Sequence, residues 1–386
     1  MFHVASDDEI RSGLITDIYF KRAVEVLHAK NIDRLVRAEF IAKGLPDGWP
    51  WAVLGGVEEC AHLMRGVGCS VRAMPEGTLF HTFEPVMEVE GPYTAFALYE
   101  TALLGLICQA SGIATRAARC KKAAGHRLLA SFGARRMHPA LAPMIERAAY
   151  IGGCDGTSVI ASAEMIGERA TGTMPHALII CFGSTVEATK AFHEVMLPDV
   201  PRVSLIDTFN DEKFEALNVA EALGNNLFAV RLDTPGSRRG NFRQLLEEVR
   251  WELDLRGHGH VKLFVSGGIG ENEIHELNDV VDAYGVGTWI SNAPVVDFAM
   301  DIIEVEGRPF AKRGKMSGAK SVWRCHSCWQ DATTPLGVVP DKACGCGGEY
   351  EELLRPLTKA GEVVAPLPPA RAIRGYVMEQ MQRFEL

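Results

Sequence analysis

From about residue 125 onward the chain repeats one pattern, in which a short apolar run leads into a turn and then into a stretch with helical spacing. The runs are RLLASFG, AAYIGGC, RVSLIDTF, NLFAVRLDT, KLFVSGG and YGVGTWIS. Strands that alternate with helices form a parallel sheet, and ligands bind such sheets at the carboxyl ends of the strands. One segment, HALIICFG (176–183), fits either a strand or the start of a helix, because periodicity cannot decide for so short a run.

The sections on either side of this repeat have a different character. Residues 21–43 and 94–122 show helical apolar spacing, while residues 75–93 alternate in the manner of strands interrupted by Pro and Gly. This predicts a separate α+β layer before the repeat. From about Ser321 the sequence is richer in Cys, Pro and Gly, which indicates a small terminal module.

Composition excludes several classes of protein. The 386 residues are 47% hydrophobic and 23% charged, as in a soluble globular protein. A net charge of −9 argues against a nucleic-acid partner, which requires a basic face. No run of about 18 apolar residues is present, and the acidic start MFHVASDDEIRSG is unlike a signal peptide. We therefore expect a cytoplasmic protein with no membrane partner.

Two successive turns of the repeat are rich in glycine. KLFVS runs into Gly267 and Gly268, and the next apolar run contains Gly285 and Gly287. Glycines at such turns let backbone N–H groups approach a ligand, and a helix that starts just after them adds its positive dipole end. The spacing matches neither G-x-G-x-x-G nor a P-loop. It favours the phosphate site that β/α barrels build after their last two strands.

Polar residues follow the other apolar runs, where a functional edge would lie. Each alone is commonly a helix cap or a surface residue. Together they offer cations for a polyanion and carboxylates for Mg²⁺ or ribose hydroxyls, which predicts a phosphorylated sugar bearing a pyrophosphate. These residues are Arg135, Arg136, Asp155, Thr157, Ser158, Asp207, Thr208, Arg231 and Asp233.

Seven short motifs occur in the order seen in nicotinate phosphoribosyltransferases, the type II relatives of the quinolinate and nicotinamide enzymes. They are TDIYF (16–20), FGARRMHP (132–139), GGCDGTS (152–158), GTMPHA (172–177), LIDTF (205–209), VRLDT (230–234) and SGGI (266–269). The resemblance implies an α/β protein with an N-terminal α/β sandwich domain (1–122), an irregular α/β barrel (123–318) and a cysteine-rich C-terminal module (319–386). It also implies an active site completed by a second subunit, hence a homodimer or higher homo-oligomer.

The same resemblance assigns a reaction and roles. Nicotinate would attack phosphoribosyl pyrophosphate, held with Mg²⁺, to form nicotinate mononucleotide and pyrophosphate. Phe132 would stack on the pyridine ring, Arg231 would line the base pocket, and Asp207 and Asp233 would hold ribose hydroxyls or Mg²⁺. The other expected substrate contacts are Arg135, Arg136, Thr157, Ser158, Lys315 and, from the neighbouring subunit, Tyr19. Ser266, Gly267, Gly268, Gly285, Gly287 and Thr288 would cradle the 5′-phosphate.

His176 has two interpretations. A histidine before an apolar run is commonly a structural residue with one backbone partner. In the family, however, the histidine of the matching motif is phosphorylated by ATP, which drives the synthesis. Pro175 stands where the family usually has a small residue, so ATP coupling in this chain stays an open alternative.

Four cysteines near the carboxyl end form two close pairs, CHSC (325–328) and CGC (344–346). Cys325, Cys328, Cys344 and Cys346 would supply the four thiolates of a tetrahedral Zn²⁺ site, and archaeal-like members of the family carry a comparable cluster. We predict a structural zinc. Free or disulfide-bonded thiols are the alternative, and His326 is a possible substitute ligand.

Four other functions can be weighed on the same residues. Quinolinate carries two carboxylates and would favour a denser cluster of cations than Arg135, Arg136 and Arg231. A nicotinamide enzyme has an acidic group where Ser158 stands. A zinc-ribbon binding module on an inactive barrel would favour a basic face, but residues 320–360 carry both signs of charge. A sugar-phosphate aldolase or isomerase requires a reactive Lys or an acid/base pair, which is not evident.

Overall fold

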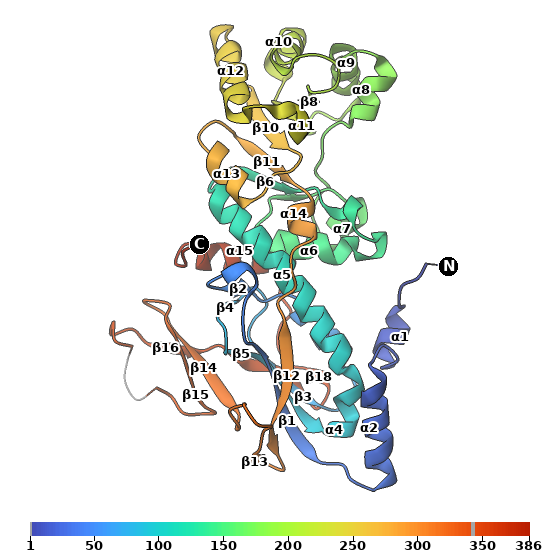
Figure 1. Cartoon of the computed structure of the whole chain (residues 1–386), viewed down its shortest axis with the longest axis vertical. Coiled ribbons are helices and arrows are strands. Elements are labelled where there is room, and N and C mark those ends of the chain that lie inside the picture. The colour runs from blue at the N-terminus through green and yellow to red at the C-terminus, as the bar shows by residue number, and fades with distance from the viewer. Residues whose placement is uncertain (1, 341–343) are drawn as a thin grey trace. The chain divides into compact units, whose positions relative to one another are not determined.

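Two stretches far apart in the sequence, Met1–Thr115 and Pro294–Leu386, build one unit of the structure (unit 1), and Arg116–Ala293 builds another (unit 2). The structure is a computed structural model and describes residues 2–340 and 344–386. These boundaries differ from the predicted ones, because residues 294–318 join unit 1. The reason is a strand, β12 (Phe298–Val305), which pairs with β1 (Leu35–Ala42) although they lie far apart in the sequence (Figure 1).

Unit 1 is built on a seven-stranded sheet with the order β13-β12-β1-β5-β3-β17-β18. Its neighbouring strands pair antiparallel. The strand β5 (Pro85–Pro92) lies within the segment 75–93 that was predicted to contain strands, and its Met87 and Val89 pack with Phe40 of β1 in a large apolar core. The remaining strands and helices of this part are α1 (Asp7–Arg11), α2 (Ile18–Ala29), η1 (Pro46–Gly48), β2 (Ala52–Val53), α3 (Val57–Met64), β3 (Ser70–Ala73), β4 (Leu79–Phe80), β5 (Pro85–Pro92), β13 (Arg308–Pro309), β17 (Arg355–Lys359) and β18 (Glu362–Val363).

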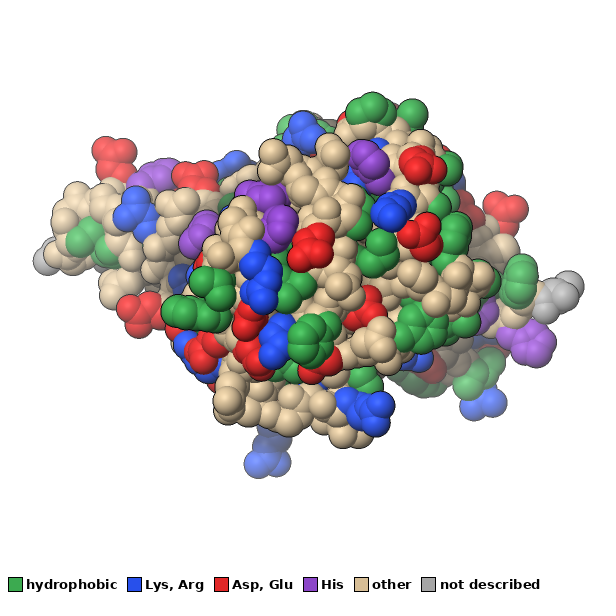
Figure 2. Space-filling view, turned by 90° about the horizontal axis from the view of Figure 1, so that it is seen from above, with side chains coloured by type: hydrophobic (Ala, Val, Ile, Leu, Met, Phe, Trp, Pro, Cys, Tyr) green, Lys and Arg blue, Asp and Glu red, His purple; other side chains and the backbone are tan. Residues whose placement is uncertain are grey.

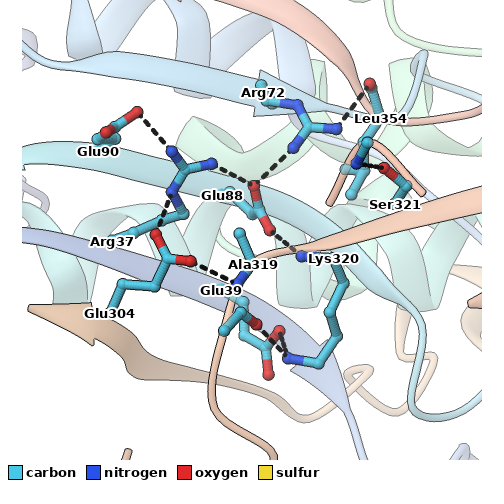
Figure 3. A network of polar contacts seen from close by, with 12 residues as sticks. Arg37, Glu39, Arg72, Glu88, Glu90, Glu304, Ala319, Lys320, Ser321 and Leu354 are labelled. Carbon is cyan, nitrogen blue, oxygen red and sulfur yellow. Dashed lines mark hydrogen bonds and ion pairs between the residues drawn. The ribbon is translucent and has the colours of Figure 1, made fainter. Parts of the chain in front are cut away.

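The other face of this sheet carries a buried network of charges (Figure 3). Glu88 accepts from Arg72 at 3.0 Å and lies 3.6 Å from Arg37, and its second oxygen accepts the backbone N–H of Lys320. The Lys320 ammonium bonds Glu39 at 2.7 Å, with both side chains less than a tenth exposed. Burial raises the pKa of Glu39, and the ion pair with Lys320 opposes that rise. The network therefore fastens the chain that follows β13 to the sheet.

The cysteine-rich segment forms a small three-stranded sheet within unit 1, with β14 (Lys320–Cys325) between β15 (Asp331–Pro335) and β16 (Tyr350–Glu352). Arg324 on β14 is almost fully buried, and its guanidinium bonds the Asp331 carboxylate, the Gln380 side chain and the Leu79 carbonyl. Gln380 ends the last helix, α15 (Ala370–Gln380). These bonds tie the small sheet to β4 and α15.

Unit 2 is a six-stranded parallel sheet with the order β7-β6-β11-β10-β9-β8. Among the described residues its end strands β7 and β8 do not pair, so the expected irregular barrel is an open half-barrel. Its strands are β6 (Leu128–Ser131), β7 (Gly156–Thr157), β8 (Val203–Leu205), β9 (Ala229–Leu232), β10 (Lys262–Ser266) and β11 (Ala283–Val286). Its helices include η3 (Ala134–Arg136), η4 (Pro139–Leu141), α6 (Ala142–Ile151), α7 (Ile160–Met165), α8 (His176–Phe182), α9 (Thr185–Val195), α10 (Glu212–Leu223), η5 (Gly224–Asn226), α11 (Gly236–Arg239), α12 (Phe242–Leu255), α13 (Glu271–Leu277) and α14 (Thr288–Ser291).

Two of the apolar runs are helices. AAYIGGC, expected as a strand, is the end of α6, because Ile145, Ala148, Ala149 and Ile151 are buried at helical spacing. The strand of this repeat is only the short β7. HALIICF, which the sequence left undecided, is the helix α8, closed by Gly183 in the left-handed conformation.

One continuous helical stretch, Tyr93–Ala124, is long and apolar enough to cross a membrane by length and composition alone. It comprises α4 (Tyr93–Phe96), η2 (Ala97–Tyr99) and α5 (Glu100–Ala124). The buried residues Leu103, Ile107 and Ala114 lie along α5, and its last turns carry the cations Lys121 and Lys122. This burial is typical of a core helix.

Candidate active site

The carboxyl edge of the parallel sheet gathers most of the residues that the sequence predicted for the site. Thr157 ends β7, Ser266 ends β10, and Asp207 and Asp233 follow β8 and β9. Parallel strands all finish at one edge, so residues far apart in the chain become neighbours there. Arg231 lies one residue before the end of β9 and faces the same region.

His176 and Asp207 form a close pair. His176 is the first residue of α8, and its Nε2 lies 3.2 Å from Asp207 Oδ2. The Asp207 side chain is 2% exposed, while the imidazole is 38% exposed. A buried carboxylate that bonds one ring nitrogen fixes the orientation of the imidazole and leaves the second nitrogen available to a ligand. The partner of His176 is therefore a carboxylate, rather than the backbone group of the structural interpretation.

Arg231 is held in a polar and aromatic setting. Its guanidinium donates to the Thr173 hydroxyl, lies 3.6 Å from Asp233 Oδ2 and stands 5.8 Å from the centre of the Phe132 ring. Burial lowers the pKa of Arg231, while Asp233 and Asp207 act to raise it. The result is a desolvated cation beside an aromatic ring, an arrangement that suits an anionic aromatic ligand.

The glycine turn after β10 allows a ligand to approach the backbone closely. Gly267 and Gly268 both adopt positive φ, at 79° and 65°, and both are exposed. A Cβ on Gly267 would lie 2.7 Å from Asp233 Oδ1, and that oxygen accepts from the Ser266 hydroxyl at 2.8 Å. The turn is braced by Arg239, whose guanidinium donates to the carbonyls of Ser266 and Gly267. Successive amides in this conformation form a concavity for an anion.

The helix after this turn contributes less to anion binding than its position in the sequence suggests. The N-terminus of α13 is already capped by its own Glu273, whose carboxylate accepts the Gly270 N–H at 2.8 Å. Glu271 adds a second negative charge in the same first turn. Any phosphate at this edge would thus be held by the turn itself and not by the dipole of α13.

The second glycine turn, at Gly285 and Gly287, makes room for the Phe132 ring rather than forming an open site for a phosphate. Gly285 is buried on β11, and a Cβ there would lie 2.4 Å from Cε2 of Phe132. Gly285 therefore makes the room in which Phe132 sits. Gly287 and Thr288 follow at the start of the four-residue helix α14, where Thr288 is exposed.

Ser158, which follows Thr157, is positioned by a buried carboxylate. Glu146 on α6 accepts the Ser158 N–H at 2.6 Å and the Ser131 hydroxyl at 2.9 Å. Burial raises the pKa of Glu146, and these hydrogen bonds oppose the rise. Asp155, also expected at this edge, instead lies at the opposite end of β7, where it bonds Lys121 at 2.7 Å and the Leu129 N–H at 2.9 Å. Its role there is structural.

Several buried polar atoms near this edge have no hydrogen-bond partner among the described residues. They are Thr157 Oγ1, Asp207 Oδ1, Thr208 Oγ1 and Arg231 Nε. Buried polar groups are nearly always bonded in a protein, so a cluster of unbonded ones indicates the place of a ligand or of water. Arg135 and Arg136 lie in η3 just after Phe132 and are exposed.

Two predicted substrate residues belong to unit 1. Tyr19 lies on α2 and is 59% exposed. Lys315 is mostly buried and pairs with the buried carboxylate of Asp301, which also pairs with Lys312 at 2.5 Å. Burial and the neighbouring Lys43 lower the pKa of Lys315.

The four predicted zinc ligands do meet. Their sulfur atoms all lie within 4.8 Å of one another, with Cys325 and Cys346 at 3.5 Å and Cys328 and Cys344 at 3.3 Å. Backbone N–H groups point at the thiols, and such a bond from Cys346 is the main reason that the pKa of Cys344 falls to about 6. Similar bonds, chiefly from Cys328, lower the pKa of Cys325. His326 is exposed and bonds Glu349 through its backbone.

Sequence reasoning missed three residues of the edge. Arg239 braces the glycine turn, Thr173 bonds Arg231, and Glu146 holds Ser158. Thr173 lies in the motif GTMPHA and Arg239 in GSRRG, but neither had a local signal for a partner so distant in the chain. A buried acidic residue within the apolar face of a helix was the signal for Glu146.

The surface of unit 2 carries mixed charge. Figure 2 shows the face of unit 2 that carries α10 and α12, and acidic, basic and hydrophobic side chains are interspersed over that face. This agrees with the net charge of −9 and with local recognition of a small anion.

Two family profiles cover most of the chain. The C-terminal domain of quinolinate phosphoribosyl transferase matches residues 113–301, and the N-terminal domain of the same family matches residues 17–111. Together they place the chain in the quinolinate phosphoribosyl transferase family.

Three individual proteins are similar to this chain over most of its length. A crystal structure of nicotinate-nucleotide pyrophosphorylase from Pyrococcus furiosus is 55% identical and superposes with a TM-score of 0.98, covering 100% of this chain and 99% of that one. A nicotinate phosphoribosyltransferase of Mycobacterium tuberculosis is 29% identical over 81% of this chain and 73% of its own length. The human nicotinic acid phosphoribosyltransferase, at 20% identity, shares the fold with a TM-score of 0.75 over 96% of this chain and 94% of that one. The chain belongs to this family of type II phosphoribosyltransferases, and the curated relatives that it matches are named nicotinate phosphoribosyltransferases.

Proposed function

We propose that the protein transfers the 5-phosphoribosyl group from phosphoribosyl pyrophosphate to nicotinate, forming nicotinate mononucleotide and pyrophosphate in NAD salvage. One observation carries the proposal. Within unit 2, a single sheet edge combines the buried cation Arg231, the carboxylates Asp207 and Asp233, and the positive-φ glycine turn. These three parts match the carboxylate, the ribose and the phosphate of the two substrates. Relatives named for the same reaction support it.

The chemistry requires positioning more than covalent catalysis. The bond from C1 of the ribose to pyrophosphate opens with oxocarbenium character, and the ring nitrogen of nicotinate approaches from the opposite face. Phe132 would stack on the pyridine ring while Arg231 attracts the carboxylate. Asp207 and Asp233 would hold the ribose hydroxyls or Mg²⁺, and their negative charges favour the developing positive charge at C1. Preorganised charges of this kind lower the barrier without reorganising in the reaction.

The amides of Gly267 and Gly268 would hold the 5′-phosphate, and the variant Gly268→Val tests this role. Gly268 has φ 65°, which a β-branched residue does not adopt without strain. The Michaelis constant for phosphoribosyl pyrophosphate should rise at least about tenfold, while that for nicotinate changes little. Gly257→Val is the matched control, because Gly257 also has positive φ but follows α12. An unchanged sugar-phosphate affinity in folded Gly268→Val would remove the assignment.

ATP coupling is a separate part of the proposal. His176 pairs with Asp207 and exposes its other side, as a histidine that accepts a phosphoryl group would. The decisive assay uses purified protein, Mg²⁺ and phosphoribosyl pyrophosphate with nicotinate, nicotinamide or quinolinate, each with and without ATP. We expect product from nicotinate alone among the three, and more of it with ATP. Dominant turnover of quinolinate or nicotinamide would overturn the substrate assignment, and no stimulation by ATP would overturn the coupling.

The cysteine cluster suits a structural Zn²⁺, held by Cys325, Cys328, Cys344 and Cys346. A Zn–S distance of about 2.3 Å places the thiolates of a tetrahedron about 3.8 Å apart, close to the separations found here. Backbone N–H groups aimed at Cys325 and Cys344 favour their thiolates, which are the form that binds the metal, while the neighbouring thiols raise the pKa of Cys328. Metal analysis of protein purified without chelator should find about one zinc per chain. Less than about half an equivalent would contradict a four-thiolate site.

The site shared between subunits stays a proposal, together with the homodimer or higher homo-oligomer that it requires. We infer that Tyr19 closes the base pocket of a neighbouring chain and that Lys315 meets the pyrophosphate. Tyr19→Ala and Arg135→Ala should each be nearly inactive, and mixed subunits should recover up to roughly a quarter of wild-type activity, because one repaired site forms in a hybrid dimer. An active monomer, or no recovery after demonstrated subunit exchange, would refute the sharing.

A further inference from the structure

The inside of the half-barrel is unusually empty. One residue from each of five strands joins a single inner cluster, and three of these five are alanines, namely Ala130, Ala229 and Ala283, with Val203 and Phe264 as the others. Closed β/α barrels fill their interior mainly with bulky branched side chains. Here the inner cluster borders a cavity of ≈ 1020 Å³ that lies wholly within unit 2. That is at the upper end of the range of about 300–1,000 Å³ typical of ligand pockets.

This cavity lies directly beneath the candidate active site. Side chains alternate along a strand, so a residue two positions further points to the same face. Two positions after Ala130, Ala229 and Ala283 stand Phe132, Arg231 and Gly285, which belong to the carboxyl edge. Phe132 and Thr173 both line the cavity, and Thr173 holds the Arg231 guanidinium. Phe132 and Thr173 therefore border the cavity and also belong to, or bond, the residues of the candidate base pocket.

The chemistry of the lining selects the ligand. The interior presents Phe132 and Phe264, with ring centres 5.9 Å apart and planes at 27°. Leu197, Phe228 and Trp251 add exposed apolar surface to the lining.

The charged groups of the lining pair with one another or with nearby residues. Arg250 bonds Asp254 at 2.7 Å and Lys262 bonds Asp282 at 3.3 Å. Acidic residues outnumber Lys and Arg in the lining, by six to four, so an anion is disfavoured.

We propose that the cavity is a second ligand site, for an uncharged aromatic molecule, and that its occupancy alters the base pocket through Phe132 and Thr173. The binding part is independent of the proposed function, whereas the coupling part rests on it. Nicotinate itself is excluded from the cavity by its charge. A ligand that presses on the lower face of Phe132 changes the position of the ring that would stack on the substrate.

Binding is tested on the intact protein with the neutral fluorescent probe N-phenyl-1-naphthylamine. We expect saturable binding of one probe per chain. Ala229→Leu places a larger side chain in the inner cluster and should weaken the affinity for the probe at least about tenfold. The control Ala222→Leu, on the exposed face of α10, should leave the affinity unchanged. If Ala229→Leu does not fold, Trp251→Ser replaces it, with the equally exposed Leu255→Ser as its control. The absence of saturable binding, or equal affinity in a folded lining variant, would overturn the site.

Coupling is tested by measuring the Michaelis constants with and without saturating probe. The constant for nicotinate should change at least about threefold, while that for phosphoribosyl pyrophosphate stays the same, because Phe132 faces the base. The effect should vanish in Ala229→Leu. Probe binding without any change in the Michaelis constant for nicotinate would overturn the coupling, while the proposed binding site would still stand. A protein that binds the probe but does not turn over nicotinate would contradict the proposed function and leave the site intact.

Discussion

The two units of this protein differ in what their buried polar groups do. In unit 1 buried charges are paired, as the contacts of Lys320 with the seven-stranded sheet and of Arg324 on the three-stranded sheet show. In unit 2 the parallel sheet leaves polar atoms of Asp207 and Arg231 without hydrogen-bond partners among the described residues at its edge, and it borders a cavity of ≈ 1020 Å³. A satisfied network stabilises a structure, whereas unsatisfied groups and empty space suit a site for ligands. The comparison predicts that damage to the buried ion pairs of unit 1 lowers stability and that damage to the carboxyl edge of the parallel sheet in unit 2 lowers activity.

The largest effect is expected for the buried ion pair of unit 1. Lys320→Met leaves the Glu39 carboxylate buried without its partner and should lower the free energy of unfolding by about 3–5 kcal/mol. The double variant Lys320→Met with Glu39→Gln removes both charges and should lie closer to the wild type. Denaturant unfolding measures both. A single variant as stable as the wild type would show that the network does not stabilise the sheet.

A buried arginine in each unit gives the sharpest contrast. Arg231→Ala should lower kcat/KM by about 100- to 1000-fold with a small change in melting temperature, because the cation serves the reacting substrates. Arg324→Ala should instead lower the melting temperature, because it leaves Asp331 and Gln380 without their partner. Steady-state kinetics and thermal denaturation on both variants check this. An Arg231→Ala variant with wild-type activity would contradict this comparison of the two units.

A smaller effect concerns pH and unit 1 alone. Hydrogen bonds to Asp331 and Glu84 raise the pKa of His81 to about 9 in the folded protein, from about 6.5 in the unfolded chain. Protonated His81 therefore stabilises the fold fully below about pH 6.5, and this contribution is lost as the pH rises through about 9. Melting temperatures from pH 6 to 10 should show the difference between wild type and His81→Gln shrinking. A difference independent of pH would exclude this protonation.

The smallest effect is expected for an exposed ion pair of unit 2, which serves as a reference for the buried groups. Lys190 pairs with Glu187 on the exposed face of α9, at 3.0 Å. Lys190→Ala should change the free energy of unfolding by less than about 0.5 kcal/mol, because an exposed pair is screened by water and costs side-chain entropy. Its kinetic constants should equal those of the wild type. A larger loss of stability would mean that surface charges also support unit 2.

Local patterns predicted much of this molecule. The alternation of apolar runs and helical stretches indicated the parallel sheet, because that sheet is built from neighbours in the chain. Glycine spacing marked the turn at Gly267 and Gly268, whose backbone requires those residues. Paired cysteines marked the thiol cluster, since C-x₂-C spacing is itself a turn that brings two sulfurs together. The order of the short motifs indicated the family.

What depends on distant parts of the chain was decided only by the tertiary structure. The pairing of β12 with β1 moved residues 294–318 into unit 1, and burial on one side turned AAYIGGC into a helix. Arg239, Thr173 and Glu146 became part of the edge through partners that no local pattern identifies. The cavity arises because alanines on three separate strands meet in one cluster on the inner face of an open sheet. Local propensity specifies each strand by itself, while packing alone specifies which side chains meet.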